Sequence, residues 1–442
     1  MRYFLALLSY RLAFIVLIPV LLIVILLRSR SQPAYRHRLL ERLGFLPKSL
    51  NPGGIIIHAA SVGEVIALKT TIDLLLADPN GLPITVTSFT PTGSSQIKKL
   101  FAGKVQHCYL PIDNTISVKL FLAQLKPSAM VFMETELWPE IIAQCHHKRI
   151  KLMLINGRLS KKSLKSYQKI SWLITPTLNH FDRVLTQSHE NYHHFIGLGR
   201  KGSACSVSGN LKFDMHITDE LKHQQAYFSQ ILPNDRPIWL VASTHVGDED
   251  LTLSALKQIK VTVPDLLMFL VPRHPERFDE VAALCLNNNF QLVRRSSEQT
   301  ITESTDIFLL DTLGELFATF TFATLVTMGG SFSRVGGHNP LEPALFKKPV
   351  MVGQYMSNFA EVLTQLQHNQ GIVQLAAQPN SSDLVRNMAD EVSNIVNSVE
   401  RQKSLGDNAY DVVITNQGAS QRTVDTLMKL LNEDGSQCAN DP

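Results

Sequence analysis

Residues 54–64 read Gly-Ile-Ile-Ile-His-Ala-Ala-Ser-Val-Gly-Glu, and they contain the unit from which most of the chain is built. The apolar run Gly54–His58 is short and rich in isoleucine, as expected of a strand that is buried on both faces. Ser61 and Glu64 follow at the spacing of a capping box, which predicts that a helix begins directly after this strand. A buried strand that leads at once into a helix is typical of parallel α/β sheets.

The same pattern recurs along the chain and predicts nine further strands. These strands are expected at Ile84–Ser88, Met130–Met133, Leu152–Ile155, Val184–Thr186, Ile238–Ala242, Leu266–Val271, Phe308–Leu310, Leu325–Met328 and Pro349–Val352. Two series of five strands, with helical patterns between them, predict an α/β protein with two Rossmann-like domains. A polar helix and the proline-containing stretch 233–237 separate the two series.

The chain has 442 residues, of which 45% are hydrophobic, and this is enough to build more than one core. We expect a membrane anchor over residues 1–30, a first Rossmann-like domain over 31–215 and a linker over 216–233. A second Rossmann-like domain, which includes the C-terminal amphipathic helices, is expected over 234–432. A disordered tail is expected over 433–442.

The N-terminal segment Phe4–Leu27 is almost wholly apolar, and Arg11 is its only charged residue. Its uninterrupted part, Leu12–Leu27, is shorter than the ~20 residues of a full span, so it predicts either a tilted span or a helix within one leaflet. Arg11 favours partial insertion. A cleaved signal peptide is the alternative, but no small-residue cleavage site follows Leu27. The arginines that follow predict a cytoplasmic body; they are Arg28, Arg30, Arg36 and Arg38.

The formal net charge of +4 conceals an uneven distribution. Residues 1–40 hold six Lys/Arg and no acid, and the stretch between Glu140 and Asp182 holds eight Lys/Arg and no acid, whereas the rest of the chain has 28 basic and 38 acidic residues. This pattern predicts an acidic partner or surface on one side of the protein. The five cysteines lie far apart without CxxC spacing, which excludes a disulfide framework or zinc ribbon and fits a reducing compartment.

In open α/β sheets, ligands bind at the carboxyl ends of the strands, so the residues that follow each apolar run are candidates for chemistry. Helix capping alone is enough to account for Glu64, although a carboxylate in this position could also accept a proton from a substrate hydroxyl. Glu134 and Glu136 directly follow a buried strand, and they are either solvated loop charges or part of a site.

Two further clusters lie in the second domain. Pro272–Phe278 follows an apolar strand and carries Arg273, His274 and Arg277, which suits phosphate recognition better than a solvated charge cluster. In Gly336–Glu342, Asn339 is expected to cap a helix, with Pro340 and Glu342 in its first turn, while the glycines let backbone amides approach an anion. No GxGxxG fingerprint, P-loop, GxSxG elbow or metal-ligand spacing is present in the sequence.

Six ordered motifs extend this interpretation, because together they resemble those of a known family. The motifs are Ser61–Glu64, Thr90–Gly93, Met133–Pro139, Gly209–Asp214, Pro272–Phe278 and Gly336–Glu342. They are similar to the motifs of the bacterial 3-deoxy-D-manno-octulosonic acid (Kdo) transferases of lipopolysaccharide and lipid A biosynthesis. The resemblance extends from the apolar N-terminus to about residue 425. One departure is Gly157, where the family usually has alanine; this is expected to loosen a turn and leave Arg158 in place.

The resemblance implies a GT-B glycosyltransferase, family 30, in which two Rossmann-like domains face a cleft and an N-terminal helix anchors the protein. It implies an inverting transfer of Kdo from CMP-Kdo to the 6'-hydroxyl of lipid IVA, a lipid A precursor. No cofactor and no bound metal are expected in the chemical step. The domain over 31–215 would then lie on the acceptor side, and the domain over 234–432 would bind CMP-Kdo.

The resemblance also assigns roles to individual residues. Glu64 is expected to be the general base, a role that can coexist with capping, and Glu134 and Lys212 match positions that stabilise the transition state. The expected CMP-Kdo-binding residues are Pro272, Arg273, Leu313, Gly314, Glu315, Asn339, Pro340, Leu341 and Glu342.

The implied partners are CMP-Kdo, lipid IVA and the anionic lipids of the inner membrane, with the catalytic domains on the cytoplasmic face and no nucleic acid. The second basic block would help to dock the bisphosphorylated acceptor and the membrane. Its candidate residues are Arg158, Lys161, Lys162 and Lys165. Ordinary solvated helix charge is the alternative explanation for these lysines.

Two other functions remain open from the sequence. A different GT-B sugar-nucleotide transferase or epimerase would share the glycine-rich second domain, but it is not expected to share both Glu64 and the Met133–Pro139 motif. A membrane-anchored scaffold that binds anionic lipid would explain the anchor and the basic blocks, but not the carboxylates at the strand ends.

Overall fold

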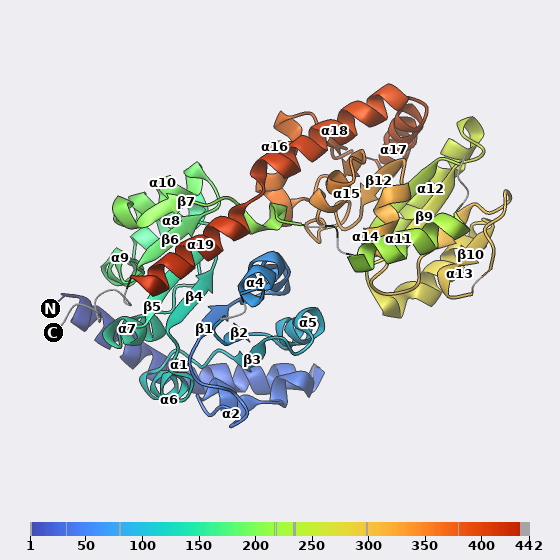
Figure 1. Cartoon of the computed structure of the whole chain (residues 1–442). Coiled ribbons are helices and arrows are strands. Elements are labelled where there is room, and N and C mark those ends of the chain that lie inside the picture. Colours follow the sequence, from blue (N-terminus) through green and yellow to red (C-terminus); the bar gives the residue numbers. More distant parts are fainter. Residues whose placement is uncertain are drawn as a thin grey trace. The chain divides into compact units, whose positions relative to one another are not determined.

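The structure is a computed structural model, and it describes residues 2–31, 33–78, 81–215, 217, 219–232, 236–297, 299–378 and 380–433. The chain forms two compact units (Figure 1). Unit 1 comprises Met1–Asp214 and Asn416–Pro442, and unit 2 comprises Met215–Thr415. Each unit is built around one seven-stranded sheet, and every strand pairing that the structure records is parallel.

The sheet of unit 1 has the order β3-β2-β1-β4-β5-β6-β7. In chain order its strands are β1 (Ile55–His58), β2 (Ile84–Ser88), β3 (Gln106–Tyr109), β4 (Ala129–Met133), β5 (Lys151–Gly157), β6 (Arg183–Thr186) and β7 (Cys205–Val207). The helices of unit 1 are α1 (Arg2–Ser31), α2 (Leu39–Arg42), α3 (Val62–Ala67), α4 (Lys69–Leu76), α5 (Pro91–Phe101), α6 (Thr115–Leu125), α7 (Pro139–His147), α8 (Lys161–Gln168), α9 (Ser171–Asn179), α10 (His189–Gly197) and α19 (Ala419–Asn432).

The sheet of unit 2 has the order β10-β11-β9-β8-β12-β13-β14. Its strands are β8 (Ile238–Thr244), β9 (Leu267–Pro272), β10 (Leu292–Arg294), β11 (Ile307–Leu309), β12 (Leu325–Met328), β13 (Val350–Val352) and β14 (Val373–Gln374). Its helices are α11 (Asp219–Ile231), α12 (Asp248–Thr262), α13 (Phe278–Asn287), α14 (Leu316–Thr319), α15 (Leu341–Leu345), α16 (Ala360–His368), α17 (Ser381–Val396) and α18 (Val399–Asn416).

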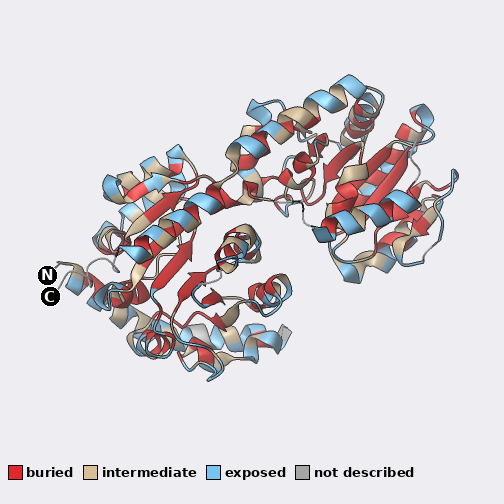
Figure 2. Cartoon of the chain, viewed as in Figure 1, coloured by how far each residue is buried: buried red, intermediate tan, exposed pale blue. Residues whose placement is uncertain are grey.

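The cores explain why the central strands are continuous apolar runs. Along β1, Ile56 belongs to one hydrophobic cluster, whereas Ile55 and Ile57 belong to another, because alternate side chains point to opposite faces of a strand. Helices cover both faces, so the strands are buried throughout (Figure 2). This confirms the predicted fold class, an α/β protein with two parallel-sheet domains of the GT-B type.

Each sheet has one point at which the order of its strands reverses. In unit 1 the chain builds outward from β1 to β2 and β3, and then places β4 on the other side of β1. In unit 2 the corresponding reversal lies between β8 and β12. Ligands of open α/β sheets bind outside the carboxyl ends of the strands at such points, so these two places are where a site is expected.

The C-terminal helix corrects the expected domain boundary. Residues up to 432 were assigned to the second domain, but α19 packs against unit 1, where Leu427 joins the core cluster on the α4 side of the sheet. Asp214 fixes the start of this helix, because its carboxylate accepts hydrogen bonds from the backbone amides of Gly418 and Ser420. The final segment of the chain therefore completes unit 1.

Two other expected segments also differ from the structure. The expected linker over 216–233 consists mostly of α11, which buries Leu221 and Phe228. Of the expected disordered tail over 433–442, only Glu433 is among the described residues. The segment of the expected anchor forms α1, which among the described residues is the one helix long and apolar enough to cross a membrane, by length and composition only.

Candidate functional site

Glu64 lies in the first turn of α3, at the carboxyl end of β1 and next to the reversal point of unit 1. The predicted cap is present, since the Ser61 Oγ accepts a hydrogen bond from the Glu64 amide at 3.3 Å. The Glu64 carboxylate accepts a hydrogen bond from the backbone amide of Ala60 at 2.9 Å, rather than from the backbone amide of Ser61 as in a standard capping box, and it is also hydrogen-bonded by the Ser61 side chain. Burial, together with the nearby charges of Glu134 and Glu136, raises the pKa of Glu64 to about 7.

Glu134 and Glu136 lie in the loop that follows β4, the strand on the other side of the reversal point. Glu134 has a positive φ of 53°, and its amide donates to the carbonyl of Ile155 at 2.9 Å, which ties this turn to the end of β5. Glu136 accepts a hydrogen bond from the Trp138 indole at 2.8 Å, and burial raises its pKa. These carboxylates are therefore held in a formed turn close to Glu64, not scattered in a solvated loop.

Lys212 belongs to a short 3-10 helix, Leu211–Phe213, that follows β7. A chain of buried amides fixes this segment against β5. The side chain of Asn210 accepts from the Lys212 amide at 3.0 Å, and the side chain of Asn156 accepts from the Leu211 amide at 3.1 Å. The Gln187 side chain joins them, because it donates to the Asn156 carbonyl and accepts from the side chain of Asn210. Lys212 therefore lies beyond the carboxyl ends of the strands, as Glu64 and Glu134 do.

Gly157 contradicts the expectation of a loosened turn. It is the last residue of β5, and a Cβ atom there would lie 2.9 Å from the Leu154 side chain and 3.1 Å from the carbonyl oxygen of Leu185. The backbone approaches closely at this point, so glycine fits the strand rather than loosening a loop. Arg158 follows directly, and its carbonyl accepts a hydrogen bond from the Thr135 hydroxyl.

The lysines of the second basic block lie on α8. Lys161, Lys162 and Lys165 are exposed to solvent, and Lys161 forms an ion pair with Glu190 at 3.7 Å. Arg158 is half-buried at the start of the loop that leads to this helix. These four residues lie close together in the chain, and the three lysines are as exposed as ordinary charged residues on a protein surface.

In unit 2 the glycine-rich loops lie at the carboxyl ends of the strands, as the sequence predicts. The predicted cap is displaced by one residue, because α15 begins at Leu341 and its N-cap residue is Pro340, which makes no side-chain cap. The side-chain oxygen of Asn339 still accepts from the Leu341 amide at 3.2 Å, and its amide group donates to Glu342 at 3.3 Å. Burial raises the pKa of Glu342 to about 7, against the opposing effect of the charge of Arg273. Gly337, with a φ of 78°, has no room for a side chain, since a Cβ atom would lie 2.2 Å from the Met356 sulfur.

The remaining candidates of unit 2 are the Pro272–Phe278 cluster, with Arg273 and Arg277, and the expected donor-site residues Leu313, Gly314 and Glu315. Arg273 is exposed directly after Pro272, the last residue of β9. Arg277 instead forms a two-pronged ion pair with the fully buried Glu249, at 2.6 and 3.3 Å, so it has a structural partner rather than a free guanidinium. Leu313 is largely exposed, Gly314 has a φ of 93°, and Glu315 pairs with Arg295 at 3.0 Å.

A histidine cluster at the reversal point of unit 2 was not predicted from the sequence. The Nε2 atoms of His245 and His338 lie 2.8 Å apart with their rings stacked, and His274 packs edge-on against His245. Burial, with nearby cationic groups, lowers the pKa of His338 to about 4. Asp248 joins the two strands at the reversal point, because its carboxylate accepts from the amides of His245 and Gly330.

The missed residues share one signal in the sequence. Asn156, Gln187 and Ser243–His245 each come directly after a predicted strand, which is the position that we used to select Glu134 and Arg273. Polar uncharged residues there are less conspicuous than carboxylates and arginines. Among the described residues, no group of three or more His, Cys, Asp or Glu side chains is arranged to hold a metal ion.

Comparison with known proteins points to one family. A family model described as 3-deoxy-D-manno-octulosonic-acid transferase (kdotransferase) matches residues 37–215. The 3-deoxy-D-manno-octulosonic acid transferase of Haemophilus influenzae is 37% identical over 415 residues, covering 93% of this chain and 96% of that protein. The protein of the same name from Rickettsia typhi is 32% identical, and the match covers 87% of this chain and 81% of that protein.

Among solved structures, one of those that match over most of the chain supports the fold. The UDP-GlcNAc 2-epimerase of Neisseria meningitidis matches 85% of this chain and all of its own, with a TM-score of 0.57 and 15% identity, so the likeness concerns the fold alone. The C-terminal CMP-Kdo binding domain of WaaA from Acinetobacter baumannii is 31% identical and covers 44% of this chain and 97% of its own, with a TM-score of 0.40. The identity with the full-length relatives shows that this chain belongs to the 3-deoxy-D-manno-octulosonic acid transferases, the Kdo glycosyltransferases of lipopolysaccharide biosynthesis.

Proposed function

We propose that this Kdo transferase takes Kdo from CMP-Kdo and attaches it to the 6'-hydroxyl of lipid IVA, with inversion at the anomeric carbon. The observation that carries the proposal is Glu64, a buried carboxylate at the reversal point of unit 1 whose pKa is raised to about 7. A base with a pKa near the working pH is both partly ionised and a good proton acceptor, which suits deprotonation of a sugar hydroxyl.

The proposed reaction needs one base and no covalent intermediate. The acceptor oxygen forms a bond to C2 of Kdo while its proton passes to the Glu64 carboxylate, and the bond from C2 to the phosphate oxygen breaks. CMP leaves with that electron pair. Attack from the face opposite the leaving group inverts the configuration, and the step involves no metal in this proposal.

Glu134 and Lys212 act on the charges that develop in this step. A carboxylate stabilises the oxocarbenium character of the sugar, and an ammonium group offsets the charge of the leaving phosphate. Their support is positional: Glu134 is held by its bond to β5, and Lys212 is held by the amides of Asn156 and Asn210 at the same edge of the sheet. Preorganised charges of this kind need no reorganisation during the reaction.

Unit 2 is the proposed CMP-Kdo site. Arg273 and the backbone amides of the glycine-rich loops would bind the phosphate, while Glu342 would accept hydrogen bonds from the ribose hydroxyls. The remaining proposed donor-site residues are Pro272, Leu313, Gly314, Glu315, Asn339, Pro340 and Leu341. Support comes from the family, and from the position of these residues at or after the carboxyl ends of β9, β11 and β12.

The proposed setting is the cytoplasmic face of the inner membrane. The apolar helix α1 and the arginines after it support membrane association, since such a pattern holds the downstream part of a protein in the cytoplasm. Arg158, Lys161, Lys162 and Lys165 would attract the two phosphates of lipid IVA and the surrounding anionic lipids.

Direct assay of the purified full-length protein tests this proposal. With CMP-Kdo and lipid IVA in detergent, we expect release of CMP and an acceptor whose mass rises by one or more Kdo residues. Transfer to lipid IVA but not to a derivative that lacks the 6'-hydroxyl would support the acceptor assignment. Absence of transfer from CMP-Kdo, with transfer from a UDP-sugar instead, would overturn the donor assignment.

A further inference from the structure

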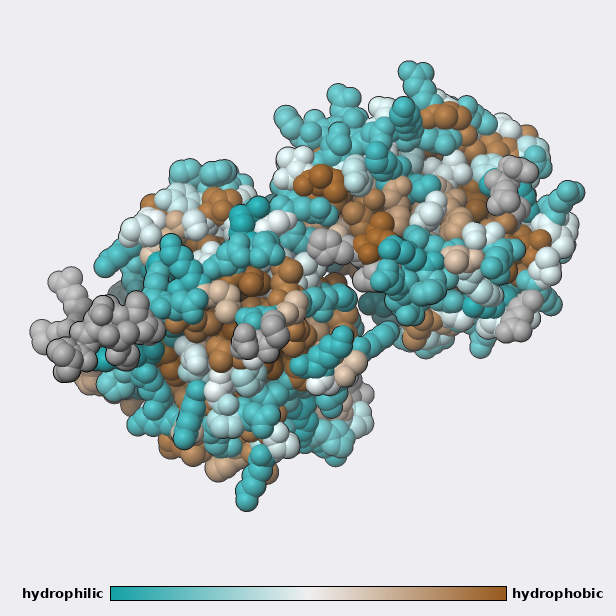
Figure 3. All heavy atoms as spheres, in the orientation of Figure 1, coloured by the Kyte–Doolittle hydropathy of each residue, from teal (hydrophilic) through white to brown (hydrophobic). Residues whose placement is uncertain are grey.

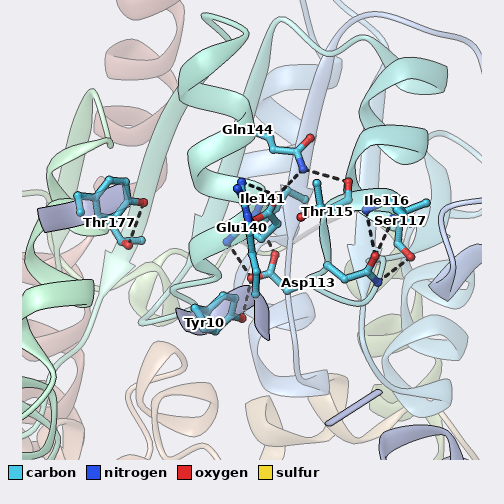
Figure 4. A network of polar contacts seen from close by, with 12 residues as sticks. Tyr10, Asp113, Thr115, Ile116, Ser117, Glu140, Ile141, Gln144 and Thr177 are labelled. Carbon is cyan, nitrogen blue, oxygen red and sulfur yellow. Dashed lines mark hydrogen bonds and ion pairs between the residues drawn. The ribbon is translucent and has the colours of Figure 1, made fainter. Parts of the chain in front are cut away.

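Helix α1 is fastened to unit 1 by a polar network that involves two neighbouring side chains (Figure 4). The guanidinium of Arg11 donates two hydrogen bonds to the carboxylate of Glu140, at 2.6 and 3.2 Å, and the Glu140 side chain is fully buried. Gln144 also donates to Glu140, at 2.6 Å. The single charge within the apolar segment is therefore neutralised by the protein itself.

The second side chain reaches the start of α7. The hydroxyl of Tyr10 donates to Asp113 at 2.8 Å, and Asp113 in turn accepts from the backbone amides of Glu140 and Ile141, at 2.9 and 2.8 Å. Asp113 therefore caps α7, whose N-cap residue, Trp138, makes no side-chain cap of its own. Through this network α1 is joined to the helix that directly follows the Glu134 loop.

The burial of α1 repeats with a helical period along its length. One stripe of residues, three, four or seven positions apart, is buried or half-buried: Tyr3, Leu7, Tyr10, Phe14, Ile18, Ile25 and Ser29. The opposite side carries exposed apolar residues from one end to the other: Phe4, Leu5, Leu8, Leu12, Ile15, Val16, Val20, Ile23 and Leu27. An inner and an outer face of this kind indicate a helix that lies lengthwise along the body of unit 1.

Views of the whole chain agree with this arrangement. Figure 1 shows α1 running along one side of unit 1, where it contacts α7 and α9. In the space-filling view, hydrophobic residues are interspersed with hydrophilic ones over the visible face of unit 1 (Figure 3). A helix that crossed a bilayer alone would meet lipid on all sides along most of its length, whereas α1 has one side against unit 1.

We propose that α1 does not span the membrane but lies in its plane, with the outer face in the acyl-chain region of a single leaflet. The outer face of α1 would thus contact one leaflet of a bilayer that contains anionic phospholipid. Charge supports this choice, because the apolar face ends at Arg28 and Arg30, both exposed and suited to anionic head groups. The Arg11–Glu140 and Tyr10–Asp113 contacts then hold unit 1 at a fixed depth and orientation.

A depth profile of α1 in vesicles tests this proposal, which refines the proposed membrane location. Single cysteines would replace Leu12, Val16, Val20 and Ile23 on the outer face, and Phe14, Ile18 and Ile25 on the inner face, in a full-length background with Cys438→Ser. After spin labelling in phosphatidylethanolamine–phosphatidylglycerol vesicles, accessibility to oxygen and to a water-soluble nickel chelate reports depth. The circular dichroism spectrum of each variant, compared with that of the wild type, shows that it is folded.

For a helix in the membrane plane, we expect the outer labels to share one shallow depth and the inner labels to be shielded from both reagents. A depth that rises and falls along the sequence, equally on both faces, would show a spanning helix and overturn the proposal. High nickel accessibility on the outer face would show that no lipid covers it, and would also overturn the proposal. Because the profile needs no substrate, it stands apart from any failure of the proposed donor or acceptor.

The role of the Arg11–Glu140 ion pair in holding α1 against unit 1 is tested by Glu140→Gln. Glu190→Gln, on the exposed surface of α10, is the matched control. Loss of the buried charge should loosen α1, so that oxygen accessibility at labelled position 14 rises several-fold in Glu140→Gln and stays unchanged in Glu190→Gln. An unchanged value at position 14 in Glu140→Gln would show that the ion pair does not hold the helix.

Discussion

Glu64 combines a structural and a chemical task at one position. Its backbone amide is capped by Ser61, while its carboxylate accepts hydrogen bonds from the Ala60 amide and the Ser61 side chain and is buried close to Glu134 and Glu136. Burial of a carboxylate among other carboxylates disfavours the charged form and thereby costs stability. Such a cost is common at functional sites, where the arrangement serves the reaction rather than the fold.

Removing this charge is therefore expected to stabilise the protein. The pKa of Glu64 is raised from 4.5 to about 7 in the folded state, so the folded state binds more protons than the unfolded state between these values, and stability falls as the pH rises through that window. Above pH 7 the full cost is present. Glu64→Gln should raise the free energy of unfolding by about 3 kcal/mol at pH 8 and have little effect at pH 4.

Chemical denaturation followed by tryptophan fluorescence measures this difference. Equal stability of the two proteins at pH 8 would show that the Glu64 carboxylate is not destabilised by its surroundings. Ser61→Ala is a useful comparison, because loss of the cap should lower stability by about 1 kcal/mol at either pH.

The chemistry-bearing residues differ in how well the sequence alone could find them. Position directly after an apolar strand selected Glu134 and Arg273, and the same criterion would have found Asn156 and His245. The contacts that fix these residues could not be predicted. The bond from Asn156 to the Leu211 amide, for example, joins residues that are far apart in the chain and depends on the order of the strands.

At the scale of elements, the ten predicted strands are all present, and four further strands were missed. The missed strands are β3, β7, β10 and β14. All four lie at the edges of the two sheets, where residues are only partly buried. The prediction relied on continuous apolar runs, which mark strands covered on both faces, so it could not detect the more polar edge strands.

The sequence also could not predict that α19 packs against unit 1. Its amphipathic pattern shows that one face is buried, but not which domain covers that face. The deciding contacts come from residues about two hundred positions earlier in the chain, notably the Asp214 carboxylate at the helix start.

The contact between α1 and α7 makes a quantitative prediction at this scale. In Arg11→Ala, the fully buried Glu140 loses its cationic partner and keeps only Gln144, so the free energy of unfolding should fall by about 3 kcal/mol, near the low end for breaking a buried pair. Lys69→Ala breaks the exposed Lys69–Asp73 pair and should cost less than about 0.5 kcal/mol. Similar losses in the two variants, measured by denaturation in detergent, would contradict the structural role of Arg11.

At the scale of the whole molecule, the two units share one feature at their reversal points, which is a buried carboxylate in the first turn of the helix that follows a central strand. Glu64 after β1 and Asp248 after β8 each lie in the first turn of a helix, and each accepts a hydrogen bond from a nearby backbone amide. Burial is the main reason that the pKa of each is raised, to about 7 for Glu64 and about 6 for Asp248. In unit 2 the carboxylate is occupied with joining the two strands, whereas Glu64 is left to act as the proposed base.

We propose that the two basic blocks of the chain bind the membrane and the acceptor. Reversal of three exposed lysines on α8, as Lys161→Glu, Lys162→Glu and Lys165→Glu, should raise the KM for lipid IVA several-fold and leave that for CMP-Kdo nearly unchanged, because only the acceptor lies in an anionic surface. A matched triple reversal in unit 2, of Lys222, Lys257 and Lys403, should affect neither constant. Equal effects of the α8 variant on both substrates would remove the docking role.

The central claim is that Glu64 is the base for Kdo transfer, and the pH dependence of kcat/KM for wild type and Glu64→Gln tests it most directly. In the wild type, transfer from CMP-Kdo to lipid IVA should weaken below an apparent pKa of about 7, since a base must be deprotonated to act. Glu64→Gln should be at least ~100-fold slower and should lack this limb. Near-normal turnover of Glu64→Gln, with the same fall at low pH, would contradict the assignment.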